Sequence, residues 1–179
     1  VLQLSAATTP KLVLIRNDTS IVTNDHLGII DFHSIDGGTK RVARICARAS
    51  GNHGADDGPT DLIFHTMGDN TATNAEERLR ITSDGKVGIN QSSPNDILEI
   101  HPVSNNQGLT LKDTGAVYPA ITADTNRTGS DEFLLNIRGR WNGTTVANIL
   151  LETGADTTNK DDGVISFRTA SAGSPAERL

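Results

Sequence analysis

The stretch Ala43-Arg44-Ile45-Cys46-Ala47-Arg48-Ala49 has a period of two, with apolar residues at the odd positions and arginines or a cysteine between them. Successive side chains of a β-strand point to opposite faces, whereas a helix repeats its apolar face every three or four residues. The stretch therefore predicts a strand. Ala147, Ile149 and Leu151 repeat the same pattern in the second half of the chain, so we expect β-structure there as well.

The chain resembles itself at a spacing of about one hundred residues, and such a repeat takes precedence over other sequence signals. The matching segments are Ala43-Arg44-Ile45 with Ala147-Asn148-Ile149, Leu62-Ile63-Phe64-His65-Thr66 with Ile165-Ser166-Phe167-Arg168-Thr169, and Glu77-Arg78-Leu79 with Glu177-Arg178-Leu179. These matches predict two units, residues 1–96 and 97–179. The second stops where the first continues, so we expect a piece of a longer array.

The repeat also predicts which side chains share a face. Phe64 and Phe167 should hold the same strand position and point into the core, while Ile63 and Ser166 face the other way. Asp84-Gly85 lies between two alternating segments, and such a pair is a strong hairpin signal because both residues tolerate positive φ. We expect a hairpin there with Ile81 and Val87 on its buried side. The predicted fold class is all-β, with short antiparallel strands and hairpins.

A longer motif surrounds this hairpin. It reads Glu77-Arg78-Leu79-Arg80-Ile81-Thr82-Ser83-Asp84-Gly85-Lys86-Val87-Gly88-Ile89-Asn90, followed by Ser93-Pro94 and a short apolar strand at Ile97-Leu98-Glu99-Ile100. The motif resembles the repeats of tailed-bacteriophage tail fibres, in which Glu-Arg-hydrophobic-Arg-Ile, a glycine turn, Val-Gly-Ile-Gly and Ser-Pro recur. Asn90 departs from that pattern, because the family usually has glycine at this position.

The resemblance implies a β-rich, intertwined homotrimer that lies outside the cell as part of the virion. Its expected partners are other tail-fibre segments and the polysaccharide of the host surface. The same repeat occurs in large bacterial surface proteins, so a cell-surface adhesin is an alternative. The residues independently favour assembly: the chain has only 3% aromatic residues, and stacked short strands would bury little apolar area alone.

Composition and charge exclude several classes of function. The chain has 22 acidic and 16 basic residues and a net charge of -6, which argues against a general nucleic-acid-binding role. No apolar run approaches the roughly 20 residues that a membrane-spanning helix needs. Cys46 is the only cysteine, so it can form neither an intrachain disulfide nor a Cys-rich zinc site.

We expect no enzymatic activity, no metal site and no cofactor. No nucleophile, base and orienting acid stand out as a set, and the five histidines fall at no metal-ligand spacing. Asp56-Asp57 and Asp161-Asp162 each precede glycine, and this pattern is more typical of turns than of a calcium loop. The alternative of a tail-spike polysaccharide depolymerase would need a groove with two suitably spaced carboxylates.

One polar run in the second unit is a candidate glycan-binding site. Trp141 is the only tryptophan, and Arg138 and Arg140 precede it in a turn-prone segment. A sugar ring could stack on the indole, and arginines offer planar donors to the carboxylates or sulfates of acidic glycans. The alternative is that Trp141 covers the edge of a trimer core.

Overall fold

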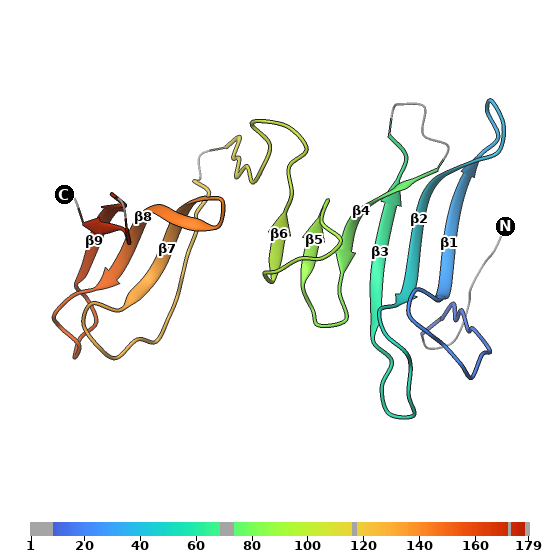
Figure 1. Cartoon of the computed structure of the whole chain (residues 1–179), viewed down its shortest axis with the longest axis horizontal. Helices are drawn as coiled ribbons and strands as arrows, with labels where there is room; N and C mark the ends of the chain where they lie inside the picture. Colours follow the sequence, from blue (N-terminus) through green and yellow to red (C-terminus); the bar gives the residue numbers. More distant parts are fainter. Residues whose placement is uncertain (1–8, 69–73, 116–117, 172, 178–179) are drawn as a thin grey trace. The chain divides into compact units, whose positions relative to one another are not determined.

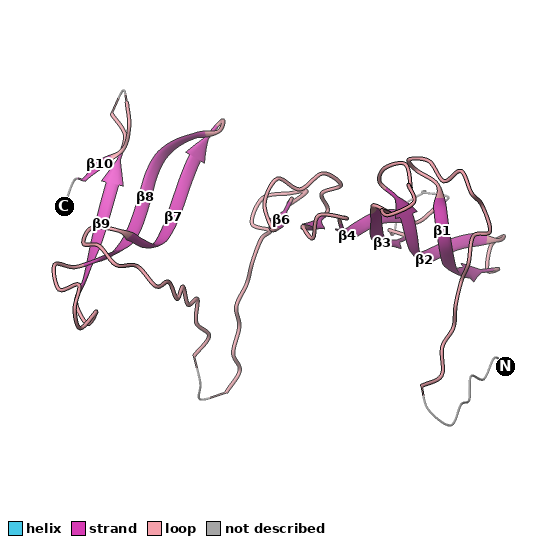
Figure 2. Cartoon of the chain, turned by 90° about the horizontal axis from the view of Figure 1, so that it is seen from below, coloured by secondary structure: helices cyan, strands magenta, loops and turns pink. Residues whose placement is uncertain are grey.

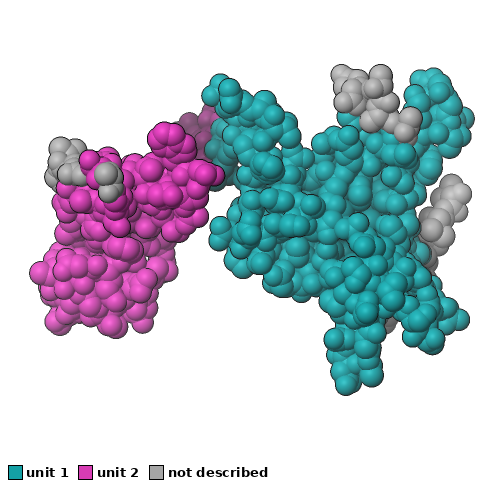
Figure 3. All heavy atoms as spheres, in the orientation of Figure 1, with its two compact units in different colours: residues 1–110 teal, residues 111–179 magenta. Residues whose placement is uncertain are grey.

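The computed structural model describes residues 9–68, 74–115, 118–171 and 173–177. The chain divides into two compact units, Val1–Thr110 and Leu111–Leu179 (Figure 3). The described residues form strands and loops without any helix, which confirms the expected all-β class (Figure 2). Within that part of the chain, no helix could therefore cross a membrane. The repeat boundary after residue 96 stays a prediction.

Unit 1 is a single six-stranded sheet, drawn in blue to green in Figure 1. Its strands are β1 (His26–Ser34), β2 (Lys40–Ala49), β3 (Thr60–Thr66), β4 (Glu76–Ile81), β5 (Val87–Ile89) and β6 (Leu98–Ile100). They lie in sequence order, and every neighbouring pair is antiparallel except β5 and β6, which are parallel. This meander follows from the closely spaced glycine and aspartate turns, because antiparallel neighbours need only short connections.

The hairpin expected at Asp84-Gly85 is confirmed, and its geometry explains the glycines at positions 85 and 88. Gly85 has a φ of +84°, which a side chain would strain. A Cβ on Gly88 would lie 2.0 Å from the Gln91 carbonyl oxygen, so only glycine fits there. Asn90, the departure from the tail-fibre pattern, has a φ of +59°, a conformation that asparagine tolerates better than most residues.

Unit 2 is a four-stranded antiparallel sheet, drawn in orange to red in Figure 1. Its strands are β7 (Phe133–Trp141), β8 (Thr144–Thr153), β9 (Gly163–Thr169) and β10 (Ala176–Glu177), in the order β10-β9-β8-β7. Asn142 and Gly143 join β7 to β8 with φ values of +49° and +82°. Two consecutive residues with positive φ form the turn type whose twist matches an antiparallel hairpin.

The strand register confirms the repeat for two of the three matches that the sequence predicted, whereas Arg178 and Leu179 of the third lie outside the described residues. Pairs in unit 1 have counterparts in unit 2 at a shift of 104 residues on the central strand and 103 on the next: Ala43–Thr66 with Ala147–Thr169, Ile45–Phe64 with Ile149–Phe167, Cys46–Ile63 with Leu150–Ser166, and Ala47–Leu62 with Leu151–Ile165. The first strands correspond too, with matching irregularities at Phe32/His33 and Gly139/Arg140. The two units are therefore structural repeats.

Equivalent backbone hydrogen bonds fix the segment that precedes the first strand of each repeat. The Asn24 N–H donates to the Ala49 carbonyl at 2.8 Å, and the Asp131 N–H donates to the Thr153 carbonyl at 3.1 Å. Asn24 and Asp131 both have positive φ. Equivalent residues of the two units are 107 positions apart here and on the first strand. The spacing falls to 104 on the second strand, because the hairpin loop shortens from residues 35–39 in unit 1 to residues 142–143 in unit 2. A sequence comparison alone could not place this change in the loop.

The predicted direction of the two phenylalanines is wrong for the single chain. Ile63 and Ser166 are buried, with exposed fractions of 0% and 1%, whereas Phe167 is 45% exposed and Phe64 half-buried. In the hairpin, Ile81 is likewise 38% exposed and Val87 half-buried. The period of two holds, but among the described residues no second layer of the same unit packs over most of the more apolar face.

Candidate functional site

The most distinctive surface of unit 1 is one face of its sheet, on which two rows of apolar residues cross all six strands. Residues that are directly paired between neighbouring strands point to the same face. The first row is Ile30, Ile45, Phe64, Leu79, Ile89 and Ile100, and the second is Gly28, Ala47, Leu62, Ile81, Val87 and Leu98. We call these twelve residues the unit 1 apolar face.

This face remains largely open to solvent. Ile30, Leu62, Ile89 and Leu98 are all exposed. Leu12 and Leu14 lie by the part of it formed by β1 to β3, where they border a hollow with Gly28, Ile45 and Leu62. A sheet face of this extent normally packs against another layer, so it is a candidate assembly surface.

Unit 2 repeats this face on three strands. Its rows are Leu135, Leu151 and Ile165, followed by Ile137, Ile149 and Phe167, and then Gly139, Ala147 and Thr169. Among these nine residues, which we call the unit 2 apolar face, Ile137, Ile149, Leu151, Ile165 and Phe167 are exposed. A hollow on it is bordered by Ile137, Gly139, Ala147, Ile149, Phe167 and Thr169, together with parts of Asn148 and Arg168.

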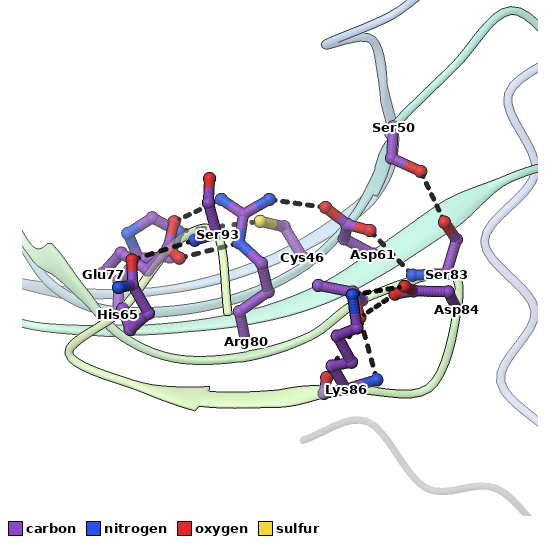
Figure 4. A network of polar contacts seen from close by, with 12 residues as sticks. Cys46, Ser50, Asp61, His65, Glu77, Arg80, Ser83, Asp84, Lys86 and Ser93 are labelled. Carbon is purple, nitrogen blue, oxygen red and sulfur yellow. Dashed lines mark hydrogen bonds and ion pairs between the residues drawn. The ribbon is translucent and has the colours of Figure 1, made fainter. Parts of the chain in front are cut away.

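The opposite face of unit 1 is covered by its own long polar side chains. Arg80 lies across from Ile63 on the neighbouring strand and is buried, with an exposed fraction of 6%. Its guanidinium donates to Glu77 at 2.8 and 2.7 Å and to Asp61 at 2.5 Å (Figure 4). The hydrogen bond from Arg80 to Glu77 is the main cause that raises the pKa of Arg80. The network closes over Ile63, and this explains why an isoleucine is buried on the more polar face.

A cysteine and a histidine lie beside this network but are not poised for nucleophilic chemistry. The Cys46 Sγ is 3.8 Å from the His65 Nε2 (Figure 4). Burial raises the pKa of the Cys46 thiol and lowers the pKa of His65. Both shifts favour the neutral pair over the thiolate and imidazolium that a cysteine nucleophile needs. The arrangement is that of a packed side-chain pair.

The corresponding face of unit 2 also carries a buried acid. Glu152, which is 5% exposed, accepts hydrogen bonds from the Ser166 hydroxyl and, at 2.8 Å, from the Arg168 guanidinium. Arg168 in turn lies 5.8 Å from the centre of the Phe133 ring. An ion pair of this kind costs desolvation, and here the buried Arg168 Nε has no hydrogen-bond partner among the described residues. The ion pair holds β8 and β9 together on the polar face.

The acidic turns have the structural role that the sequence predicted for them. Asp57 Oδ1 accepts a hydrogen bond from the Gly54 N–H at 2.7 Å, and the Asp162 carboxylate accepts from the Asp156 N–H at 3.1 and 3.2 Å. Hydrogen bonds from nearby backbone groups are typical of aspartate in turns. In the described part of the chain, no three His, Cys, Asp or Glu residues are grouped so that they could hold a metal ion.

The structure separates the three candidate glycan-binding residues. Arg138, Arg140 and Trp141 are all exposed at the end of β7, and Trp141 reaches 76% exposure. The irregularity at Gly139/Arg140 places its extra residue, Val146, on β8, so β7 itself alternates from residue 135 to 141. Both arginines therefore lie on the polar face, and Trp141 lies on the same side of the sheet as the unit 2 apolar face. The arginines and the indole therefore do not form one site. Glycan binding by these residues stays a prediction.

Several exposed residues of the assembly surface were not singled out by sequence analysis. Phe32 of β1 extends the unit 1 apolar face beyond Ile30, and the signal was present in the period-two spacing of Gly28, Ile30 and Phe32. A Cβ on Gly28 would approach the Leu14 Cβ to 3.1 Å. The absence of a side chain at Gly28 therefore lets the segment that precedes β1 lie close to the sheet edge. No local sequence pattern reveals this contact.

Comparison with known proteins agrees with this architecture. No family model matches the chain, and no curated protein matches it. The carboxy-terminal domain of the bacteriophage T5 L-shaped tail fibre is similar in structure, with a TM-score of 0.67 and 13% identity over 99% of this chain and 84% of that one. The same domain solved with its intramolecular chaperone domain gives a TM-score of 0.67 and 12% identity, covering 99% of this chain and 59% of that one. The chain therefore has a fold similar to that of the bacteriophage T5 L-shaped tail-fibre carboxy-terminal domain.

Proposed function

We propose that this chain is a structural segment of a trimeric bacteriophage tail fibre, in which the apolar faces of three copies pack against one another. The observation that carries the proposal is the pair of six-strand apolar rows in unit 1, repeated in unit 2 and exposed in the single chain. Apolar surface of this kind is favourably removed from water. The number of copies rests on the resemblance to tail-fibre repeats, which the shared fold supports.

In this role the protein is mechanical and not enzymatic. Stacked repeats extend a quasi-one-dimensional structure without requiring a large core in any one unit. Neighbouring fibre segments are its partners, and its place is in the virion, outside the host cell. The neutral Cys46–His65 pair and the turn-bound aspartates support the absence of catalysis, because each of these groups has a structural partner.

Thermal unfolding at different chain concentrations tests the assembly. If only the assembled state is fully packed, mass action makes the melting temperature rise as the chain concentration increases. We expect a rise over a hundredfold concentration series between ~0.5 and ~50 µM, a range that spans typical assembly constants. A melting temperature that is the same across the series would contradict the proposal.

A second candidate function is attachment to acidic host glycans through Arg138 and Arg140. At the position of Arg138, unit 1 has Asp31, whose carboxylate pairs with Arg44 at 2.7 Å. Arg138 faces Asn148 instead, which leaves its charge without an acidic neighbour across the strand pair. Exposed guanidinium groups of this kind favour carboxylates, sulfates or phosphates.

Binding to acidic polysaccharide from the host surface, measured by calorimetry, tests this second function. The double substitution Arg138→Gln with Arg140→Gln should abolish binding. The matched control is Arg78→Gln with Lys86→Gln, which removes the same charge from unit 1 and should leave binding unchanged. Equal losses in the two variants would indicate a non-specific charge effect and refute the arginine site.

A further inference from the structure

The glycine in the unit 2 apolar face is not required by the fold of its own chain. Gly139 lies inside β7, where glycine weakens a strand relative to other residues. Its φ is not in the left-handed region, and an added Cβ would meet the Ala147 carbonyl oxygen at 3.6 Å, an ordinary contact. A larger side chain would therefore fit in the single chain. Glycine within a strand often marks a bulge or the close approach of another group, and the same irregularity in unit 1 has Phe32 at this position, so the bulge does not require glycine.

The equivalent positions of unit 1 have the opposite distribution of volume. Phe32 corresponds to Gly139, and Ser34 corresponds to Trp141, by the matching register of the first two strands in each unit. In unit 1 the large residue comes first and the small one second, whereas in unit 2 the small residue comes first and the large one second. Both pairs share a face, because the register irregularity beside each places its extra residue, Val42 or Val146, on the neighbouring strand and leaves β1 and β7 themselves uninterrupted. Volume exchanged between two positions indicates that they fill the same space.

In the single chain, Trp141 does not fill the space left by Gly139. Trp141 is 76% exposed, and the hollow at Gly139 is bordered by Ile137, Ile149 and Phe167 without the indole. A large aromatic side chain is thus exposed beside an open apolar hollow of the same face. The two positions lie two residues apart, about 7 Å along the strand.

We infer that the Gly139 hollow of each chain receives the Trp141 side chain of a second copy. This inference rests on the proposed three-chain assembly, and it specifies how unit 2 packs within it. A threefold axis brings the same residues of all copies to the same height, so each indole meets the hollow of a neighbour at nearly its own level. Exposed aromatic residues seated in pockets of a partner are the usual anchors of an interface. Trp141 is then an assembly residue and its ring is withdrawn from glycans.

The tryptophan is the only one in the chain, so its fluorescence reports this contact directly. In the assembled protein we expect emission at shorter wavelength than in the unfolded chain, and protection from acrylamide. Light scattering on the same sample gives the number of copies. A trimer in which acrylamide quenches the tryptophan as strongly as in the unfolded chain would overturn this inference while leaving the proposed function intact. A monomer would overturn both.

An exchange of the two residues provides the second test. Gly139→Phe fills the hollow, and Trp141→Ser removes the side chain that would occupy it. Each change alone should therefore raise the chain concentration at half-assembly by about tenfold or more. The double variant copies the Phe32 and Ser34 arrangement of unit 1 and should recover most of this loss. The hairpin positions are exposed, so the single chains should keep their strand content by circular dichroism. Losses that simply add in the double variant would refute the shared space. An emission that moves to shorter wavelength only when saccharide is added to the trimer would refute it too, because the indole would then be free to bind sugar.

Discussion

Two neighbouring residues of β9 give opposite predictions for folding and for assembly. Ile165 is 62% exposed on the unit 2 apolar face, and Val164 is 44% exposed on the polar face. From the single chain alone, Ile165→Ala should be the milder of the two changes, because its side chain contacts less of its own unit. The proposed assembly reverses this order, because it buries the apolar face and leaves the polar face in water.

The size of the effect follows from the exposed fraction. Truncation of a fully buried isoleucine to alanine costs about 2–5 kcal/mol. With 62% of Ile165 exposed, we expect about 1–3 kcal/mol per chain to be lost only on assembly. Three copies bring this to roughly 3–9 kcal/mol per trimer, or roughly two to six powers of ten in the dissociation constant. Val164→Ala should change assembly by less than about 0.5 kcal/mol per chain.

Sedimentation velocity over a dilution series measures both variants against the unchanged protein. Ile165→Ala should dissociate at chain concentrations where the unchanged protein and Val164→Ala remain assembled. Urea unfolding of the dissociated chains, at equal concentration, serves as the control for folding. If Val164→Ala weakens assembly as much as Ile165→Ala does, the assignment of the two faces is wrong.

Three further predictions concern other parts of the chain. Gly88→Ala should destabilise unit 1 by about 1–3 kcal/mol in urea, since its Cβ would overlap the Gln91 carbonyl, whereas the same change at exposed Gly173 should have little effect. Burial lowers the pKa values of His26 and His65, so the folded state binds fewer protons than the unfolded state. The free energy of unfolding should therefore be highest above pH ~6.5 and decrease below it. Replacing both histidines with glutamine should remove this decrease between pH ~7 and ~5. Incubation with host polysaccharide should leave its chain length unchanged; depolymerisation that one carboxylate substitution abolishes would refute the non-enzymatic role.

The sequence was sufficient to predict several strands and one hairpin, because these depend on local signals. It did not predict β1, and the segment at 138–141, expected to be turn-prone, belongs to β7. Alternation in Ala43–Ala49 and its counterpart predicted β2 and β8, and the glycine turn predicted the β4–β5 hairpin. The internal repeat then predicted the equivalence of β3 and β9, which the register reproduces residue by residue. Matching strand positions requires only periodicity and turn chemistry.

The direction of the faces could not be predicted by the same means. Sequence reasoning assigned Phe64 and Phe167 to the core because apolar residues are usually buried, but it could not show that each unit supplies only one layer. Nor did it reveal that Arg80, with Asp61 and Glu77, would enclose Ile63 on the other face. Such tertiary contacts between polar side chains leave no periodic signal. The separation of Trp141 from Arg138 likewise became clear only once β7 was defined.

The mass of the chain in solution tests the central claim most directly, because the apolar faces are explained only if other copies cover them. Size-exclusion chromatography with multi-angle light scattering at micromolar concentration should give about three times the chain mass of 19.0 kDa. A single species at 19.0 kDa that remains folded and soluble at that concentration would contradict the account.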